Sequence, residues 1–570
     1  MSQRSFCRIR RLGALGAAML AGALLAGCAT QPQAPVCTGT ELPASRQFLQ
    51  QVSASGAIVR WRGDADALCA GTAMERLDIR VAATEDAGHR QAVLGGLKPD
   101  TVYYYSVGGA GGAPAQQWFR TAPASGKVPA DGNTRIWILG DSGTETEEFM
   151  GRASHRGEAR AVMEGYLKYN REQGGDEPLD LLLLLGDNAY LAGTDAQWQG
   201  AYFDVYGELL HRVATWPTIG NHEMGVTPVD VCAMFPAPGC DKGPVKIPLG
   251  GTSESADPRS YDSDGDGPDP EGLPYLGIFA LPAAGEMGGV PSGTEQYYSF
   301  DHGNVHVVSL DSQLSNRDPA QRAAMRDWLV DDLSANRQDW TVVVFHHPPY
   351  SKGMNHDSDL EQAEIDMRST FGPVFQDHGV DVVYSGHSHS YERSWYLHGH
   401  FGTADSFDAA THAELDSAGK PALGQGEEPY GQLSRASGAD DKVVYTVAGS
   451  AGKADSATPC RPGQRMMCSD DSWLAHPAHR SFDTGKPGHR PNGLALKGSV
   501  VLDAGRATLR SRFVDEHGAV LDEFTMTRGK SPQVRLRPNA HGVRSAEAEP
   551  KGAEPAPAAL TTAAPAAAAW

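Results

Sequence analysis

The sequence predicts an α/β domain built on buried parallel strands, preceded by a smaller all-β domain. One observation is the uninterrupted leucine run from Leu181 to Leu185, which is too short to span a membrane and too uniformly apolar for an exposed strand. Such runs are typical of strands buried on both faces of a parallel sheet. A second observation is that further apolar strands alternate with helical stretches from residue 135 to about 450, as in α/β proteins.

The N-terminus has the pattern of a secretory signal. Arginines precede an apolar run from Leu12 to Leu25, and this run ends in Leu25-Ala-Gly-Cys28, which resembles a bacterial lipobox. We therefore expect residues 1–27 to be a lipoprotein signal peptide and Cys28 to be lipidated, with ordinary cleavage nearby as the alternative. The expected product is an exported bacterial lipoprotein, anchored to a membrane on the periplasmic side or at the cell surface, with residues 28–40 as a tether.

Export places the remaining cysteines in an oxidising compartment, where they are expected to pair. Six cysteines allow 15 arrangements. The simplest one joins neighbours in the sequence: Cys37 with Cys69, Cys232 with Cys240, and Cys460 with Cys468. A zinc cluster is the competing interpretation, but the chain has no close Cys-x-x-Cys spacing to favour it.

Residues 41–123 alternate between apolar and polar positions, which predicts an all-β domain. The run Leu97-Lys-Pro-Asp-Thr-Val-Tyr-Tyr-Tyr resembles a fibronectin type III domain. At the other end of the chain, residues 529–570 are rich in Ala, Pro and Glu and are expected to be disordered.

Potential metal ligands follow the apolar strands of the α/β region. Because parallel strands present their carboxyl ends at one edge, we expect these residues to share one cleft: Asp141, Asp187, Tyr190, Asn221, His346, His387 and His389. Carboxylate, amide, phenol and imidazole donors suit iron, zinc or manganese better than thiolate-preferring ions. Seven ligands exceed the needs of one ion, so two ions sharing a bridging carboxylate are expected. The net charge of −21 argues against a nucleic-acid polymer as partner.

Five motifs carry a resemblance to the purple acid phosphatases of the metallophosphoesterase superfamily. They are Gly140-Asp-Ser-Gly143, Gly186-Asp-Asn-Ala-Tyr190, Gly220-Asn-His-Glu223, Val343-Val-Phe-His346 and Gly386-His-Ser-His389. The resemblance implies a catalytic domain of layered β-sheets flanked by helices over residues 130–528. It also implies a ferric ion bound by Asp141, Asp187, Tyr190 and His389, and a divalent iron, zinc or manganese ion bound by Asn221, His346, His387 and the bridging Asp187.

The first motif departs from the wider superfamily. A histidine commonly stands two residues after the first aspartate there, whereas this chain has Gly143. Tyr190 can supply the missing ligand.

The resemblance further implies hydrolysis of a phosphate monoester, with a metal-bound hydroxide attacking phosphorus. His222 and His356 are the expected proton donors or phosphate contacts, and Glu223 is expected to orient His222. The role of His347 stays open, because it follows a ligand directly whereas adjacent residues of a strand face opposite ways. The expected substrate is a small phosphorylated molecule, and the sequence does not indicate an oligomeric state.

Other functions compete with this interpretation. A phosphodiesterase or nucleotidase could use the same metals, and a catalytically silent surface lipoprotein is the alternative from another class. Asp262, Asp264 and Asp266 match the first half of an EF-hand calcium loop, although Leu273 stands where its final glutamate belongs. This segment therefore predicts either a calcium site, with adhesion as a function, or a solvated acidic loop.

Overall fold

The computed structural model describes the chain from Cys37 to Gly529 with several gaps. The described residues are 37–149, 152–172, 179–230, 232, 242–243, 246–354, 356–433, 442–456 and 470–529. The expected signal peptide, the lipidation site Cys28, three of the cysteines (Cys240, Cys460 and Cys468) and the tail from residue 530 lie outside them. Within the described part, no helix combines the length and the apolar character needed to span a membrane.

Two β-sheets form the centre of the α/β region that follows residue 133. The strands of the first are, in spatial order, β21 (Tyr430–Leu433), β25 (Val520–Gly529), β24 (Thr508–Asp515), β23 (Gly498–Ala504), β9 (Thr134–Leu139), β12 (Leu181–Leu184) and β13 (Ala214–Pro217). Those of the second are β16 (Tyr298–His302), β17 (Val305–Ser309), β18 (Trp340–Val344), β19 (Val382–Ser385), β22 (Val444–Ala448) and β20 (Tyr391–Arg393).

The leucine run forms β12, at the centre of the first sheet. This strand pairs in parallel with β9 on one side and with β13 on the other, so that Leu183 lies opposite Ile138 and Trp216. Every residue of β12 is buried, as expected for a strand covered on both faces. In the second sheet, β17, β18, β19 and β22 are likewise parallel neighbours.

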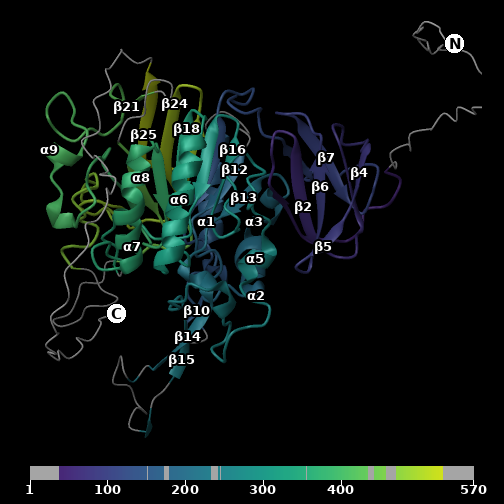
Figure 1. Ribbon diagram of the computed structural model, residues 1–570, viewed down its shortest axis with the longest axis horizontal. Helices are drawn as coiled ribbons and strands as arrows, with labels where there is room; N and C mark the ends of the chain where they lie inside the picture. Colours follow the sequence, from purple (N-terminus) through teal and green to yellow (C-terminus); the bar gives the residue numbers. More distant parts are fainter. Residues whose placement is uncertain are drawn as a thin grey trace, which may run out of the picture. The chain divides into compact units, whose positions relative to one another are not determined.

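Helices cover the outer faces of the sheets (Figure 1). On the second sheet, α6 (Pro319–Ala335) and α8 (Gly372–Asp377) pack their apolar side chains on Val308, Val343 and Val383. Asp318 caps α6, because its carboxylate accepts the amides of Ala320 and Gln321.

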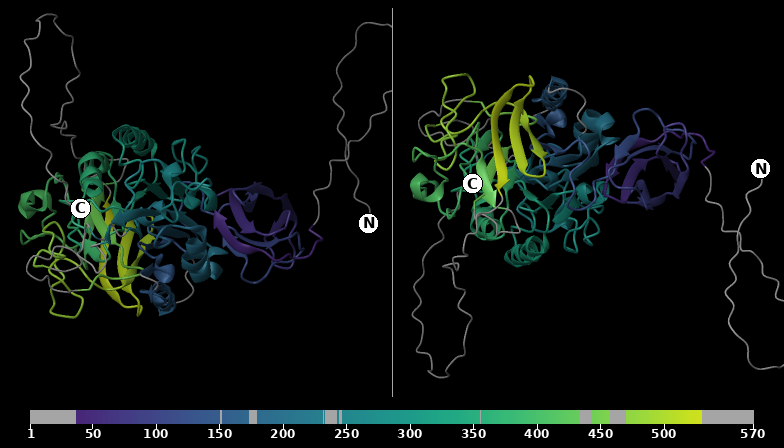
Figure 2. Two further views of the ribbon diagram at one scale, coloured as in Figure 1. Left: turned by 90° about the horizontal axis from the view of Figure 1, so that it is seen from below. Right: turned by 90° about the horizontal axis from the view of Figure 1, so that it is seen from above.

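On the first sheet, α1 (Glu158–Glu172) packs on β23 and β24. Both views of Figure 2 accordingly place this blue helix beside the yellow strands. The shorter helices are α2 (Asp195–Trp198), α3 (Asp204–Leu210), α5 (Pro274–Ile278), α7 (Gln362–Asp366) and α9 (Ala409–His412). Two hairpins complete the region: β10 (Glu148–Phe149) with β11 (Arg152–Ala153), and β14 (Val226–Asp230) with β15 (Lys246–Gly250).

The N-terminal region is an all-β sandwich. One layer contains β4 (Ile79–Ala82), β3 (Ala67–Gly71), β7 (Val102–Val107) and β8 (Trp118–Arg120); the other contains β1 (Ser45–Gln50), β2 (Gly56–Arg62), β6 (His89–Gly95) and β5 (Thr84–Asp86). The predicted disulfide between Cys37 and Cys69 is present and ties the start of the described chain to β3. Cys232 is also disulfide-bonded, while Cys240, its expected partner, lies outside the described residues.

The N-terminal region and the α/β region share one sheet. β1 pairs in parallel with β13, with Leu49 opposite Ala214, and this pairing produces a sheet of eleven strands among the described residues. The Gln50 amide also donates to the Thr215 carbonyl at 2.8 Å. The described chain is consequently one compact unit.

Candidate metal centre

The loops that follow β9, β12, β13, β18 and β19 meet at one end of the two sheets. Asp141, Asp187 and His387 each occupy the left-handed backbone region, with φ of 56°, 54° and 69°. Each follows a glycine in the sequence, and each is nearly or fully buried. Left-handed non-glycine residues cost free energy and cluster at functional sites, so these sharp corners mark the place where the chain turns side chains into the site.

A first group of donor atoms surrounds the hydroxyl of Tyr190. This oxygen lies 3.2 Å from Asp141 Oδ1, 3.0 Å from Asp187 Oδ2 and 3.5 Å from His389 Nε2. Two carboxylates, a phenol and an imidazole therefore converge on one point.

A second group of donor atoms surrounds the side-chain oxygen of Asn221. Its Oδ1 lies 2.9 Å from His346 Nε2 and 3.0 Å from His387 Nδ1, and these two nitrogens are 3.2 Å apart. Asp187 Oδ1 lies 3.4 Å from His346 Nε2. One carboxylate, that of Asp187, thus offers one oxygen to each group.

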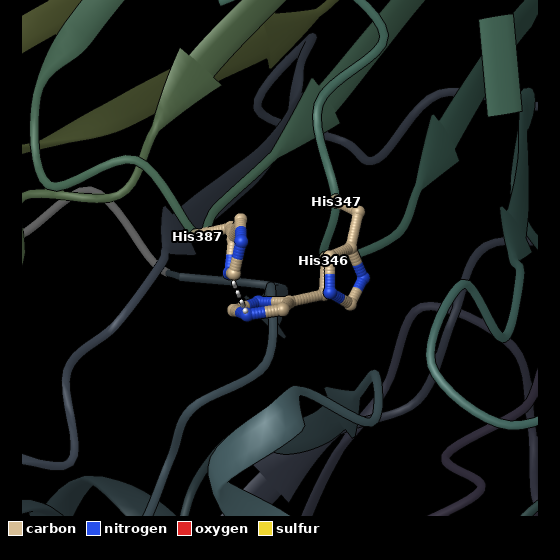
Figure 3. Close-up of side chains that lie close together, drawn as sticks. All are labelled: His346, His347 and His387. Carbon is tan, nitrogen blue, oxygen red and sulfur yellow. Dashed lines mark hydrogen bonds between the residues drawn. The ribbon is translucent and has the colours of Figure 1, made fainter. Parts of the chain in front are cut away.

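Figure 3 shows the rings of His346 and His387 in an edge-to-face arrangement, with a dashed line between a nitrogen of each. The His347 ring also belongs to this neighbourhood, because its centroid is 4.4 Å from that of His387. The sequence left the direction of the His347 side chain open, and the structure places it beside His387. β18 ends at Val344, so strand alternation no longer applies to residues 346 and 347. The Nδ1 atom of His347 lies 2.9 Å from the hydroxyl of Ser312.

The electrostatics of the first group favour a bound cation. Burial raises the pKa of Asp141 to about 8, with His346 opposing and Asp187 reinforcing this shift. Burial and the carboxylates of Asp187 and Asp141 also raise the pKa of the Tyr190 phenol well above its usual value. A multivalent cation would offset both effects, since it stabilises the ionised form of each oxygen donor. The donor set fits such an ion.

Asp187 behaves differently from Asp141. Burial acts to raise its pKa, but the neighbouring His346 and His222 hold that pKa well below its ordinary value. The Asp187 carboxylate also accepts the backbone amide of His222 at 2.8 Å. An ionised carboxylate fixed in this way is suited to lie between two cations.

Close contacts leave no room for larger residues at two glycines of the site. A Cβ atom at Gly386 would lie 2.5 Å from Asp141 Oδ2, and one at Gly143 would lie 2.2 Å from the carbonyl carbon of Asn188. The histidine that is common at the latter position in the wider superfamily would not fit this arrangement of loops. Tyr190, from the loop after β12, reaches the same place.

Glu223 holds the loops rather than the His222 ring, contrary to expectation. Its carboxylate accepts the backbone amides of Asp187, Asn188 and Gly220 at 2.7–2.9 Å. The His222 ring is held instead by the carbonyl of Leu191, which lies 2.8 Å from Nδ1. The oxygens of the Glu223 carboxylate are thus used by three backbone amides. Burial and the charge of Asp187 raise the pKa of Glu223 to about 7.

Two carboxylates that sequence reasoning missed also reach the site. Glu361 precedes α7 and lies 3.0 Å from both His356 Nδ1 and His387 Nε2. Asp455 follows β22 and lies 3.0 Å from His389 Nδ1. Both residues stand in polar segments without a strand or helix pattern, so only their order after the histidine motifs could have indicated them.

The acidic loop lies beside the site but forms a separate group. Asp262, Asp264 and Asp266 bring one carboxylate oxygen each within 4.8 Å of the others. The carboxylate of Asp262 already accepts the amides of Gly265 and Gly267 at 2.7 Å and 3.1 Å. Calcium binding at this loop stays a prediction.

Comparisons with known proteins agree with this geometry. Residues 134–391 match the calcineurin-like phosphoesterase family. Purple acid phosphatase 15 of Arabidopsis thaliana is 28% identical over 311 residues, which are 52% of this chain and 48% of the relative. A phosphoenolpyruvate phosphatase of Allium cepa is 24% identical over 311 residues, 53% of this chain and 50% of the relative. The chain thus spans about half the length of the curated relatives it matches.

Among solved structures, a purple acid phosphatase from yellow lupin (Lupinus luteus) seeds shares the fold, with a TM-score of 0.54 at 16% identity. The likeness covers 88% of this chain and 76% of the lupin chain. The described chain thus combines two sheets, the helices that cover them, an N-terminal sandwich and a site at the ends of the strands. Residues 134–391 therefore match the calcineurin-like phosphoesterase family, and the chain is similar to purple acid phosphatases in sequence and in fold.

Proposed function

We propose that the protein hydrolyses small phosphate monoesters at a centre of one ferric and one divalent ion. The observation that carries this proposal is the position of Asp187, whose two oxygens face two different groups of donor atoms. A carboxylate shared in this way is the usual bridge of a two-metal site. The phosphatase names of the curated relatives support the same reaction class.

The donor chemistry supports a division between the two ions. The group of Asp141, Tyr190 and His389 suits a hard trivalent ion, because a phenolate and carboxylates are hard oxygen donors. The group of Asn221, His346 and His387 is more neutral and suits divalent iron, zinc or manganese. When bound by these residues, two such ions would supply polarisation of a phosphoryl group and a hydroxide near neutral pH.

The surroundings of His222 and His356 support a role for either ring in transferring a proton to the leaving oxygen. The His222 ring lies 4.3 Å from that of Tyr190, and Leu191 fixes its orientation through Nδ1. The His356 ring lies 3.9 Å from that of His387, and Glu361 fixes its Nδ1. Either imidazole can give a proton to a departing alkoxide.

Metal counting, a visible spectrum and turnover measurements on the purified protein test the proposal. We expect two metals per chain, an absorption band from iron bound to phenolate, and faster turnover of a phosphate monoester than of a diester. Asp187→Asn should lose both activity and metal, whereas Asp331→Asn, an exposed position on α6, should retain both. Retention of two metals by Asp187→Asn would contradict the bridging role, and faster diester turnover would favour a phosphodiesterase.

The N-terminal leader supports a further proposal, that the enzyme acts outside the cytoplasm as a lipoprotein. Its lipobox-like end predicts lipidation at Cys28. Mass spectrometry of the mature N-terminus, compared with a Cys28→Ala variant, tests this. A mature chain that begins elsewhere and carries no lipid would contradict it.

A further inference from the structure

We propose that Glu361 and Asp455 are positioning residues, and that each acts at a different one of the two metal positions. Each fixes one histidine of the Gly386-His-Ser-His389 motif, Glu361 for the divalent ion and Asp455 for the ferric ion. This inference rests on the proposed two-metal function and adds two residues to it.

The two histidines present opposite ring nitrogens to the site. His387 directs Nδ1 toward Asn221 and His346, while its Nε2 lies 3.0 Å from Glu361 Oε2. His389 directs Nε2 toward the Tyr190 hydroxyl, while its Nδ1 lies 3.0 Å from Asp455 Oδ1.

A carboxylate behind an imidazole decides which of its nitrogens can bind a metal. The carboxylate accepts a hydrogen bond, so the nitrogen that faces it carries the proton and the other nitrogen keeps its lone pair for the ion. Glu361 therefore selects Nδ1 of His387 as the ligand atom, and Asp455 selects Nε2 of His389. The same pair of carboxylates also fixes the orientation of the two rings.

Each carboxylate is itself held in place. The backbone amide of Asp455 donates to the His389 carbonyl at 3.0 Å, so this residue contacts His389 through both its main chain and its side chain. Glu361 stands immediately before α7, and its amide donates to the Asp357 carbonyl at 3.0 Å.

Glu361 connects two functions of the site, because its second oxygen holds the other histidine. Oε1 lies 3.0 Å from His356 Nδ1, while Oε2 serves His387. One carboxylate thus positions both the divalent-metal ligand and a proposed proton donor. Glutamine at this position has a single acceptor oxygen and can serve only one of the two rings.

The substitutions should affect different metals. Loss of a carboxylate partner of a metal-binding histidine typically lowers metal affinity by about 10–100-fold. We expect Glu361→Gln to lower the affinity for the divalent ion by that factor and to leave the visible band of the iron unchanged. Asp455→Asn should alter or weaken the visible band and leave the affinity for the divalent ion near that of the wild type.

The experiment compares wild type, Glu361→Gln, Glu361→Asp, Asp455→Asn and the surface control Asp331→Asn, each purified with its metals. Chelator competition measures retention of the divalent ion, and absorption spectra report the iron. Added divalent metal should restore the divalent-metal content of Glu361→Gln but only part of its kcat, because Glu361 also positions His356. Glu361→Asp, which keeps the carboxylate on a shorter side chain, should retain more divalent metal than Glu361→Gln.

Two outcomes would overturn the inference alone: wild-type retention of the divalent ion in Glu361→Gln, or a change of the visible band in that variant as large as in Asp455→Asn. A wild-type protein without two metals would instead overturn the proposed function, and the inference with it. The wild-type sample therefore separates the two failures.

Discussion

The backbone corners at Asp141, Asp187 and His387 show how single residues define this site. Left-handed conformations at non-glycine residues are unfavourable by of order 1–3 kcal/mol each, and they persist because surrounding contacts determine them. The amide of His387 donates to Asp141 Oδ2 at 2.8 Å, so a hydrogen bond joins two of these turns. The site is thus preorganised by backbone as well as by side chains.

The role of His356 can be tested with leaving groups of different basicity. A general acid typically contributes about 10²–10⁴-fold to the rate, and this contribution is largest when the departing oxygen is basic. His356→Ala should therefore lower kcat/KM strongly for phenyl phosphate and only slightly for p-nitrophenyl phosphate. An equal loss on both substrates would indicate phosphate binding instead, and His222→Ala measured in parallel shows which ring is the acid.

Tyr190 is expected to give the protein its colour. Tyr190→Phe removes a hydroxyl that faces Asp141, Asp187 and His389, so the visible band should disappear and iron should be held less tightly. Absorption spectra and iron counts check this. A variant that keeps the colour of the wild type would exclude the phenolate as a ligand.

At the scale of single residues, the sequence predicted which side chains meet, because a polar residue directly after a buried strand is a local signal of a site residue. Asp141, Asp187 and His346 were found in this way. Glu361 and Asp455 were missed because their segments have no apolar periodicity, and their contacts depend on where α7 and the end of β22 lie in space. The strand rule could not decide the direction of His347, since the strand had already ended.

Among the elements, β16, β17 and α6 are joined by a buried charged group away from the site. His306 Nδ1 lies 2.8 Å from Asp301 Oδ1, and its Nε2 lies 2.8 Å from Asp332 Oδ2. Burial acts to lower the pKa of His306, but the two carboxylates outweigh it and raise that pKa to about 9. Ser299 and the amide of Val290 complete the surroundings of Asp332.

This arrangement predicts a pH-dependent contribution to stability. Because the pKa of His306 is higher in the folded state than its usual 6.5, the stabilisation is fully present below pH 6.5 and is lost as pH rises through about 9. His306→Gln should therefore lower the free energy of unfolding most at pH 6 and least near pH 10. Urea titrations of both proteins across this range measure the difference. A difference that grows with pH would contradict the assignment.

The two sheets are joined by a buried ion pair between β20 and β25. Asp522 accepts from Arg393 Nε at 2.6 Å, from Arg480 at 2.6 Å and from the Tyr391 hydroxyl at 2.9 Å, and neither Arg393 nor Asp522 is exposed. Asp522→Ala should lower the free energy of unfolding by about 3–5 kcal/mol, because it leaves a buried guanidinium without its partner.

The adjacent residue Glu523 provides the matched control. Its pair with Arg510 is exposed on both sides, so Glu523→Ala should cost less than about 1 kcal/mol. Equal costs for the two variants in denaturant unfolding would contradict the importance of the buried pair.

The elements themselves were largely predictable. The buried strands and the start of α6 at Asp318 and Pro319 have local signals in apolar runs and capping residues. The parallel strand β21, which joins β25 at the edge of the first sheet, was not predicted. It comes from a polar, glycine-rich segment, and its pairing is decided by the tertiary structure.

At the scale of the whole molecule, the sequence predicted two domains, but the structure joins them through β1 and β13. Pairing between strands so far apart in the chain leaves no local pattern, since each strand satisfies its own alternation. Side chains reinforce the junction: Arg46 and Arg62 both contact the Asp195 carboxylate at 2.7 Å, and Arg46 Nε donates to Gln199 Oε1 at 2.7 Å.

The shared sheet predicts that the N-terminal and catalytic regions unfold together. Calorimetry of the protein should show one transition, with no earlier one for the sandwich. Asp195→Ala should shift that transition to lower temperature. The free energy of unfolding should fall by about 1.5–3 kcal/mol, because hydrogen bonds to charged groups are lost around the buried Arg46. Asp66→Ala, which removes an exposed partner of Arg80 within the sandwich, should have almost no effect. Two separate transitions, or a shift confined to one of them, would mean that the β1–β13 pairing does not couple the regions.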